Sequence, residues 1–461
     1  MRLALFPFFV LFFAAVLSAA EPLKVDFSQN AGSIKPLHGI NNSPLTHGQV
    51  LPELRDAGIP YCRLHDIFGR FGGGPYVDIP NVFPNFDADP NDPASYDFTF
   101  TDAYLKGLTA TGMKPIYRLG VTIENYQSLK AYRIFPPKDF EKWAKICEMI
   151  IRHYTQGWND GFHYDMKYWE IWNEPENPQM WKGTREEFFE LYRIAANHLK
   201  KEFPDLKIGG FASCGFYAVT RPESQKNEFQ KSFLLWFDSF LAYVTAPETK
   251  APLDFFSWHL YATDPDEIAV HAAYVEEKLK EHHLEGVESV FDEWNYIEWG
   301  KTTYDDMKEM PGAAFVGAAF SLMQESGIDL ATYYDAYPAR SYCGLYYFPS
   351  QKVSRTYYVF YAFNQLFKLG TCVKSQSDHA AGIYAVAAQN ASGEAAVLVT
   401  NNRKDAAEMP VEFQGCDLSK ANVTVKLLDS GHLLEPTDGI LADGKLKLPP
   451  LSVVLITLSG K

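Results

Sequence analysis

Two acidic side chains in strongly aromatic surroundings are the residues of this 461-residue chain best suited to do chemistry. Glu174 lies near the end of the run WEIWNEP (169–175), and Glu293 lies in FDEWN (291–295). Two facing carboxyl groups can cleave a glycosidic bond, because one donates a proton to the leaving oxygen while the other captures the anomeric carbon. A lone Asn-Glu-Pro could equally be a turn with an exposed acid. The two runs together predict catalysis, with Glu174 as general acid/base and Glu293 as nucleophile.

The elements that must position these acids repeat along the chain from residue 34 to residue 368. Short β-branched or aromatic runs alternate there with longer amphipathic stretches, a pattern typical of βα units and a parallel sheet. The predicted strands are 37–41, 61–66, 114–120, 167–174, 207–213, 254–261, 289–295 and 330–336. The predicted helices are 49–57, 101–111, 138–156, 185–203, 226–243, 266–284, 312–325 and 355–368. Eight such units predict an α/β fold, a closed (β/α)8 TIM barrel with the two acids at the carboxyl ends of its fourth and seventh strands.

Beyond the barrel the sequence changes character. Residues 370–461 form short alternating runs with no helical period, which predicts an antiparallel β-sandwich as an accessory domain. Residues 22–31 are also strand-like and are a candidate strand of the same domain.

Residues 1–20 have the pattern of a secretory signal peptide: one Arg, an apolar run, and small residues before Glu21. That run is short for a membrane span, so we expect a secreted or periplasmic protein with no membrane association once the signal is removed. The net charge of −15 argues against a nucleic-acid partner and favours an oligosaccharide or glycoside substrate. The six cysteines lack the close spacing of a zinc site, and we expect neither metal nor cofactor.

The barrel with WNEP on strand four and Glu on strand seven resembles clan A of the glycoside hydrolases. Within that clan it is most similar to family 39, the β-xylosidase and α-L-iduronidase family. The runs that carry the finer resemblance are YCRLHD on strand two, SWHLYA on strand six and YYDAY on strand eight. The resemblance covers most of residues 34–460. It implies a retaining, exo-acting, β-xylosidase-like enzyme that takes part in polysaccharide degradation.

The resemblance implies that Asn173 hydrogen-bonds the sugar 2-hydroxyl. Strand alternation would turn Asn173 and Glu174 to opposite sides, so the strand must twist or bulge there. Arg63 is expected to hold Glu293 ionised, although a purely structural salt bridge is the alternative.

Five further side chains are candidates for substrate binding. His65, His259 and Tyr261 could orient the nucleophile or bind hydroxyls, and for each histidine a satisfied core residue is the other interpretation. Asp335 could bind a hydroxyl or serve the loop. Trp181, directly after WNEP, is the tryptophan that we expect to stack on a sugar.

Three other functions stay open on the sequence alone. An α-L-iduronidase-like enzyme would pair the substrate carboxylate with Arg118, Arg340 or Lys301, none of which is compelling. An endo-glycanase of another clan A family would have an open groove, whereas a pocket closed by the long loop 67–98 would favour exo action. A non-catalytic carbohydrate-binding protein would be the third, and the presence of both Glu174 and Glu293 argues against it.

Overall fold

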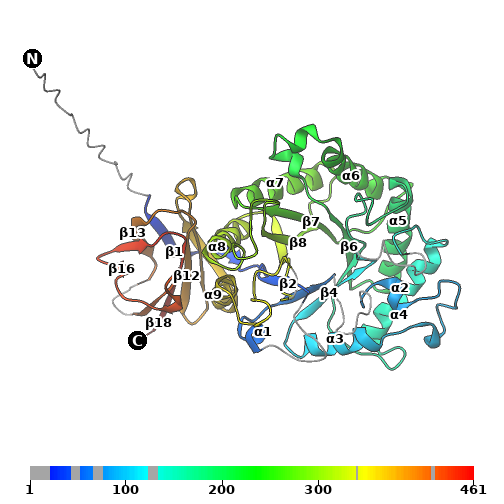
Figure 1. Ribbon diagram of the computed structural model, residues 1–461, viewed down its shortest axis with the longest axis horizontal. Coiled ribbons are helices and arrows are strands. Elements are labelled where there is room, and N and C mark those ends of the chain that lie inside the picture. The colour runs from blue at the N-terminus through cyan, green and yellow to red at the C-terminus, as the bar shows by residue number, and fades with distance from the viewer. Residues whose placement is uncertain are drawn as a thin grey trace, which may run out of the picture.

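The computed structural model describes residues 21–42, 52–65, 76–122, 133–338, 341–416 and 421–460. Eight parallel strands close into a barrel in which β2 pairs with both β3 and β9 (Figure 1). The predicted TIM barrel is therefore confirmed. Its strands are β2 (Gly39–Asn41), β3 (Tyr61–Leu64), β4 (Lys114–Leu119), β5 (Tyr168–Ile171), β6 (Lys207–Ser213), β7 (Phe255–Ala262), β8 (Glu288–Tyr296) and β9 (Ile328–Tyr333).

The helices surround the barrel and cover its apolar outer face (Figure 1). Local sequence fixes several of their ends: Thr184 and Glu187 form a capping box at the start of α5, and Gly157 ends α4 in a left-handed conformation. They are α1 (Pro52–Asp56), α2 (Ile79–Val82), α3 (Thr99–Thr109), α4 (Phe140–Gln156), α5 (Arg185–Glu202), α6 (Glu228–Thr245), α7 (Asp266–Glu281), α8 (Met310–Glu325) and α9 (Arg355–Leu369). None of the helices within the described residues is both long and apolar enough to cross a bilayer.

The fourth barrel strand is shorter than the predicted 167–174. Hydrogen-bonded strand geometry ends at Ile171, and the next residues include two left-handed positions, Trp172 with φ 74° and Glu174 with φ 47°. Such φ values cost energy in non-glycine residues and persist where the surrounding structure holds them. The irregular backbone expected beside Asn173 is confirmed. It lets Glu174 leave the strand alternation and turn toward the barrel opening.

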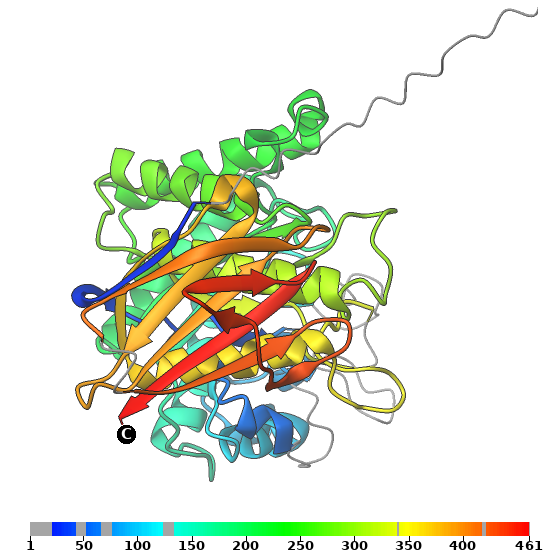
Figure 2. The ribbon, with the colours of Figure 1, turned by 90° about the vertical axis from the view of Figure 1, so that its left-hand side faces the viewer.

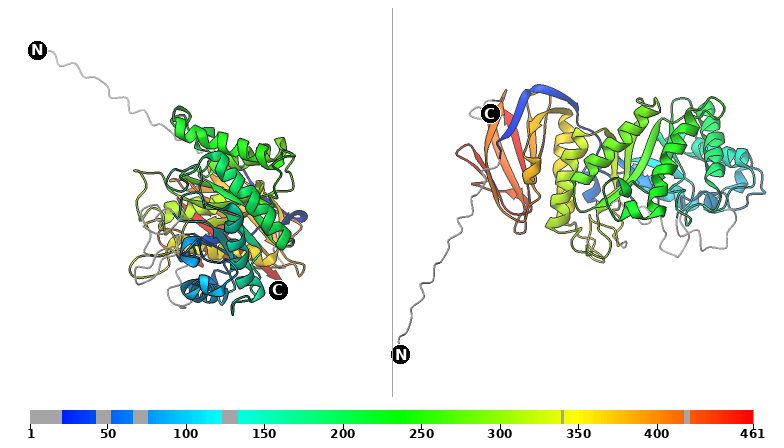
Figure 3. Two further views of the ribbon diagram at one scale, coloured as in Figure 1. Left: turned by 90° about the vertical axis from the view of Figure 1, so that its right-hand side faces the viewer. Right: turned by 90° about the horizontal axis from the view of Figure 1, so that it is seen from above.

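The C-terminal strands form one curled, mixed sheet that folds over its own apolar core (Figures 2 and 3). Its order is β15-β14-β18-β12-β11-β10-β1-β13-β17-β16. The N-terminal strand β1 (Leu23–Ser33), which contains most of the candidate segment 22–31, enters between β10 and β13 and runs parallel to β13. The sheet is therefore mixed where an antiparallel sandwich was expected, because β1 arrives from the other end of the chain. The remaining strands are β10 (Thr371–Gln376), β11 (Ile383–Gln389), β12 (Ala395–Asn401), β13 (Ala407–Gln414), β14 (Ala421–Leu428), β15 (Leu433–Pro436), β16 (Leu441–Ala442), β17 (Lys445–Leu448) and β18 (Ser452–Gly460).

Helices α8 and α9 lie between the barrel and this sheet (Figure 3). The predicted signal peptide, 1–20, falls outside the described residues, as does part of the loop 67–98. The described end of that loop, 76–98, contains α2 and packs on β4, where the Tyr117 hydroxyl donates to the carbonyl of Val77 at 2.9 Å.

Candidate active site

Glu174 and Glu293 meet at the carboxyl-terminal end of the barrel. A carboxylate oxygen of each and a ring nitrogen of His259 all lie within 4.8 Å of one another. Glu174 follows β5, whereas Glu293 lies within β8 and His259 within β7. The separation matches the two carboxyl groups of a retaining glycosidase, which lie about 5–5.5 Å apart.

Donors surround Glu293, whose side chain is 6% exposed. Arg63 Nη1 donates to Oε1 at 2.7 Å, and the Tyr261 hydroxyl donates to Oε2 at 2.8 Å. His65 Nε2 lies 3.7 Å from Oε1. These donors favour the ionised form of Glu293, the form that can act as a nucleophile.

Glu174 is the more accessible acid, with a side chain that is 20% exposed. His259 Nδ1 lies 2.8 Å from its Oε1, and Asn177 Nδ2 approaches its Oε2 at 3.5 Å. The thiol of Cys214 also bonds this carboxyl, and burial raises the pKa of that thiol well above its ordinary value. The acid that faces solvent, and hence an incoming substrate, is Glu174.

The two carboxyls are close enough to titrate as a pair. Burial raises the pKa of Glu293, and the charge of Arg63, with that of His259 when its ring is protonated, only partly offsets this. For Glu174, burial is outweighed by the hydrogen bond and charge of a protonated His259, which lower its pKa. The position of the shared proton thus depends on the protonation of His259.

Arg63 is the electrostatic centre of the site and is fully buried on β3. Its Nε donates to Glu170 at 2.7 Å and lies 2.9 Å from Asp292 Oδ2, while its Nη2 donates to Asn173 Oδ1 at 2.6 Å. Although burial opposes it, the surrounding carboxylates raise the pKa of Arg63, so the guanidinium stays charged. Arg63 therefore contacts both Glu293 and Asn173, the residue next to Glu174.

Arg118, a candidate partner of a substrate carboxylate, instead contacts His65 and Asp78. Its Nε donates to His65 Nδ1 at 3.3 Å, and its Nη2 donates to Asp78 Oδ1 at 2.6 Å. Because Nδ1 is the acceptor in this contact, Nε2 carries the hydrogen and faces Glu293. Burial raises the pKa of Asp78 to about 6, against the charge of Arg118. Arg118 is thus engaged within the protein and its side chain is fully buried.

Two of the residues that we expected to bind substrate, Asp335 and Trp181, are buried in the protein. Asp335 is fully buried after β9, where it accepts hydrogen bonds from Asn42 Nδ2 at 3.2 Å and from the backbone of Tyr337 at 3.3 Å. Trp181 is 2% exposed, and its Nε1 donates to the carbonyl of Thr184 at 2.8 Å. Its ring packs in the wall against Trp172 and has no open face for a sugar. The contacts of Asp335 agree with the loop role that was its alternative, whereas the burial of Trp181 leaves no exposed face for the stacking that we expected.

Trp299 offers the exposed ring that Trp181 lacks. It is 56% exposed, and its ring centroid lies 5.3 Å from that of Tyr261, the residue that donates to Glu293. The sequence analysis chose Trp181 and not Trp299, because exposure could not be deduced from the sequence. Glu170 was missed altogether, although a charged residue inside a fully buried strand is itself a signal, since such residues are paired. Cys214 was assigned no chemistry, yet its thiol contacts the acid.

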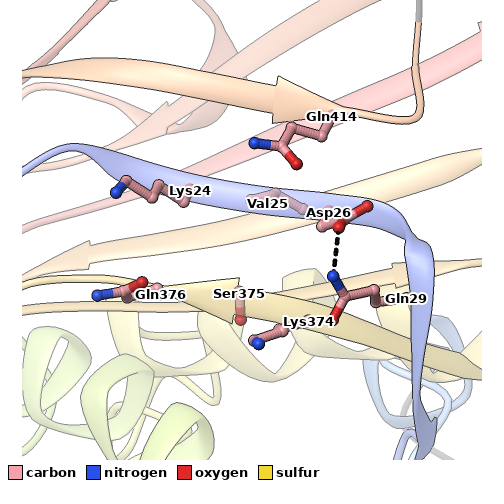
Figure 4. A pocket seen from close by; sticks show the side chains of 8 residues that line it. All are labelled: Lys24, Val25, Asp26, Gln29, Lys374, Ser375, Gln376 and Gln414. Atoms are coloured by element: carbon pink, nitrogen blue, oxygen red, sulfur yellow. Dashed lines mark hydrogen bonds between the residues drawn. The ribbon is translucent and has the colours of Figure 1, made fainter.

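The spacing of Glu174, His259 and Glu293 would also suit a cation. Arg63 and Tyr261, however, already hold both oxygens of Glu293. Another pocket lies on the C-terminal sheet between β1, β10 and β13 (Figure 4). Its polar lining includes Asp26 and Gln29, joined by a 2.7 Å hydrogen bond, and its position on the accessory sheet separates it from the paired acids.

Comparison with known proteins agrees with this geometry. The chain is 25% identical over 235 residues to a β-xylosidase of Geobacillus stearothermophilus, an alignment that covers 49% of this chain and 42% of the relative. It is 29% identical over 204 residues to a β-xylosidase of Caldicellulosiruptor saccharolyticus, covering 42% of this chain and 36% of the relative. The matched part thus spans less than half the length of either relative.

Among solved structures, the fold matches a glucosidase from Croceicoccus marinus with a TM-score of 0.75 at 21% identity, covering 96% of this chain and 99% of that one. This likeness extends through the barrel and the accessory sheet and concerns the fold alone. The model of the family described as glycosyl hydrolases family 39 matches residues 75–306, about half of the chain, and includes both Glu174 and Glu293. The chain belongs to glycosyl hydrolase family 39.

Proposed function

We propose that the protein is a retaining glycoside hydrolase in which Glu174 is the general acid/base and Glu293 the nucleophile. The observation that carries this proposal is the approach of the two carboxyl groups to within 4.8 Å at the open end of the barrel. Family 39 is a retaining family, and the spacing agrees with double displacement.

In the first step the Glu174 carboxyl gives its proton to the glycosidic oxygen while a Glu293 oxygen bonds to the anomeric carbon. The bond to the leaving group breaks with its electron pair, and a glycosyl ester on Glu293 results. In the second step Glu174, now a carboxylate, takes a proton from water as the water oxygen attacks the same carbon and releases Glu293. Arg63 and Tyr261 stabilise the carboxylate that is consumed and then regenerated.

We further propose that the substrate is a neutral glycoside, β-xyloside-like and cleaved from an end. Two similar proteins are β-xylosidases, which supports the sugar and the exo action. A uronide would require a cation that faces the substrate, yet the side chains of Arg63 and Arg118 are fully buried and held by acids. Lys301 is 72% exposed and pairs with Glu298, and Arg340 lies outside the described residues.

The test is turnover of aryl glycosides by the purified protein and by single variants. We expect Glu293→Ala to lose activity by a factor of about 10⁴ or more, and azide to restore part of it by occupying the space of the missing carboxylate. Glu174→Ala should keep activity on an activated aryl glycoside and lose it on a poor leaving group.

A matched control is Glu148→Gln, an acid on the outer helix α4 that is held by Lys145 and Arg152. It should leave turnover unchanged. A panel of aryl xylosides, glucosides, arabinosides, galactosides and uronides identifies the sugar. If no member of the panel is hydrolysed, or if Glu293→Ala equals the wild type, the proposal is wrong.

We also propose that the protein acts outside the cytoplasm. The support is the signal-peptide pattern of residues 1–20. N-terminal sequencing of the protein recovered from an expressing bacterium should begin at Glu21, and an intact Met1 in a cell-associated product would contradict export.

A further inference from the structure

Four buried polar atoms beneath the paired acids lack a hydrogen bond when all nearby acids are ionised. They are both carboxyl oxygens of Asp292, Glu170 Oε1 and His259 Nε2, and none has a hydrogen-bond partner within the described part of the chain. Arg63 Nε lies 2.9 Å from Asp292 Oδ2, but its N–H is directed at Glu170. Since buried carboxylates are normally satisfied, this cluster needs another proton.

One proton on Asp292 supplies the donor that this cluster lacks. A protonated Asp292 can donate to Glu170, which leaves the other Asp292 oxygen as an acceptor. That acceptor, Oδ1, lies 3.4 Å from His259 Nε2. A hydrogen on His259 Nε2 has this oxygen within reach, although at 3.4 Å the two groups are not aligned as a regular hydrogen bond in the structure.

We propose that Asp292 is held as a neutral carboxylic acid, and that it fixes His259 as the tautomer with its hydrogen on Nε2. The neutral ring then presents Nδ1 as an acceptor, 2.8 Å from Glu174 Oε1. An acceptor at this distance favours a hydrogen on Glu174, the state that the first chemical step requires. Asp292 is therefore a positioning residue for the acid/base, and this role rests on the proposed function.

The groups that face this cluster agree with the assignment. Asp292 is approached by Arg63, Glu170, Glu293 and His259, of which only Arg63 is a permanent cation. Burial raises the pKa of Asp292 well above its ordinary range, against the charge of Arg63. For Glu170 the balance is opposite, because the charge of Arg63, together with the hydrogen bonds that a protonated Asp292 and Ser257 donate, outweighs burial and lowers its pKa. One acid of the pair is thus neutral and the other ionised.

The competing arrangement has a protonated His259 between an ionised Asp292 and an ionised Glu174. It places more charges in a region where Asp292, Glu170, Arg63 and His259 are all fully buried. Each additional buried charge carries a desolvation penalty that an ion pair recovers only with good hydrogen-bond geometry. The neutral assignment leaves Arg63, Glu170 and Glu293 as the charged groups. With Asp292 and His259 neutral, Glu174 can keep its proton while Glu293 is ionised, and no second buried cation is needed.

Neutron diffraction from deuterium-exchanged crystals near neutral pH tests the proton positions without any assay. We expect deuterium on a carboxyl oxygen of Asp292 and on His259 Nε2, with none on Nδ1. An ionised Asp292, or deuterium on both ring nitrogens, would overturn the inference. Because no turnover is needed, this result is independent of the proposed hydrolase activity.

Kinetics of two Asp292 variants test the consequence for the acid. In Asp292→Asn the amide can donate to Glu170 while its carbonyl still accepts from His259, so kcat/KM should stay within about threefold and the alkaline limb of its pH profile should not move. Asp292→Ala removes the acceptor, so the limb should shift to lower pH and kcat/KM for a poor leaving group should fall about 10²-fold. A dinitrophenyl glycoside, which needs little acid assistance, should be affected much less.

The Asn variant is decisive even if the Ala variant does not fold. A charged Asp292 would make Asn as harmful as Ala, with equal losses on good and poor leaving groups, and that outcome would refute the role of Asp292. Loss of activity in Glu174→Ala together with a normal Asp292→Ala would leave the hydrolase assignment standing and refute this inference alone.

Discussion

Arg63 Nη1 and Glu293 Oε1 are joined by a 2.7 Å hydrogen bond across 230 positions of the sequence. The same guanidinium lies against Glu170 and Asp292, so one buried cation balances acids from two other strands. This contact makes Arg63 both a determinant of the nucleophile and a support of the fold.

Removal of this cation should be costly. Arg63→Met leaves buried carboxylates without a counter-charge, and we expect a loss of about 3–5 kcal/mol in the free energy of unfolding. Thermal unfolding at neutral pH measures it. Lys114→Met is the control, because the Lys114–Asp165 pair is 46% and 58% exposed and should contribute less than about 1 kcal/mol. Equal losses in the two variants would contradict a buried role for Arg63.

The hydroxyl of Tyr261 should tune the nucleophile. It donates to Glu293 Oε2 at 2.8 Å and so favours the ionised form. Tyr261→Phe removes this bond and should raise the pKa of Glu293, which moves the acidic limb of the pH profile of kcat/KM to higher pH. A bond to a charged group is worth about 1.5–3 kcal/mol, so kcat/KM should fall by roughly 10- to 100-fold.

Tyr117→Phe provides the matched control for that change. The Tyr117 hydroxyl is buried and donates to a backbone carbonyl, that of Val77 at 2.9 Å, so its loss affects packing and not the acids. The acidic limb should stay in place in this variant. A shift in Tyr117→Phe as large as that in Tyr261→Phe would show that the effect is general loosening of the barrel.

Two tryptophans should respond to truncation in opposite ways. Trp299→Ala should leave stability nearly unchanged and raise KM for oligosaccharides about fivefold, since an exposed ring that stacks on sugar contributes about 1 kcal/mol. Trp181→Ala should cost about 3–5 kcal/mol of stability, because its ring fills the wall beside Trp172. Thermal unfolding and KM for a disaccharide, measured on both, separate the two roles. A stable Trp181→Ala with a raised KM would restore the sequence-based expectation.

The barrel was predictable because most of its strands and helices have a clear local sequence pattern. The predicted fourth strand continued to Glu174, but the observed strand ends at Ile171, because the left-handed turn at Trp172 is imposed by tertiary contacts that propensity does not register. The mixed sheet was less predictable. The pairing of β1 with β10 and β13 joins the two ends of the chain, and no local pattern specifies such a register.

In the site too, features with a local sequence signal were predictable, and features that depend on packing were not. Glu174 and Glu293 could be located because each lies in a recognisable motif near the end of a predicted strand. The side chains that serve them depend on which face of a strand is inward and on what is exposed. Thus Arg118, considered as a ligand for a substrate carboxylate, is buried against Asp78 and His65, and Glu170 escaped notice inside an apolar strand.

A last prediction concerns Glu176, a buried acid two residues after Glu174. Burial raises its pKa to about 7 from an ordinary value of 4.5, although Ser213 and the backbone of Cys214 donate to its Oε1 at 2.7 and 2.8 Å. A raised pKa in the folded state means that Glu176 favours folding fully below about pH 4.5, and that this contribution disappears as the pH rises through about 7.

Glu176→Gln keeps both acceptor contacts and removes the charge. Relative to the wild type it should therefore be neutral near pH 4 and more stable above pH 8, by about 3 kcal/mol from the size of the shift. Thermal unfolding across this pH range measures the difference, and Glu186→Gln, whose side chain is 70% exposed, should show none. A variant less stable than the wild type at pH 8 would mean that the folded protein stabilises the ionised form of Glu176 through a charge that the observed contacts do not include.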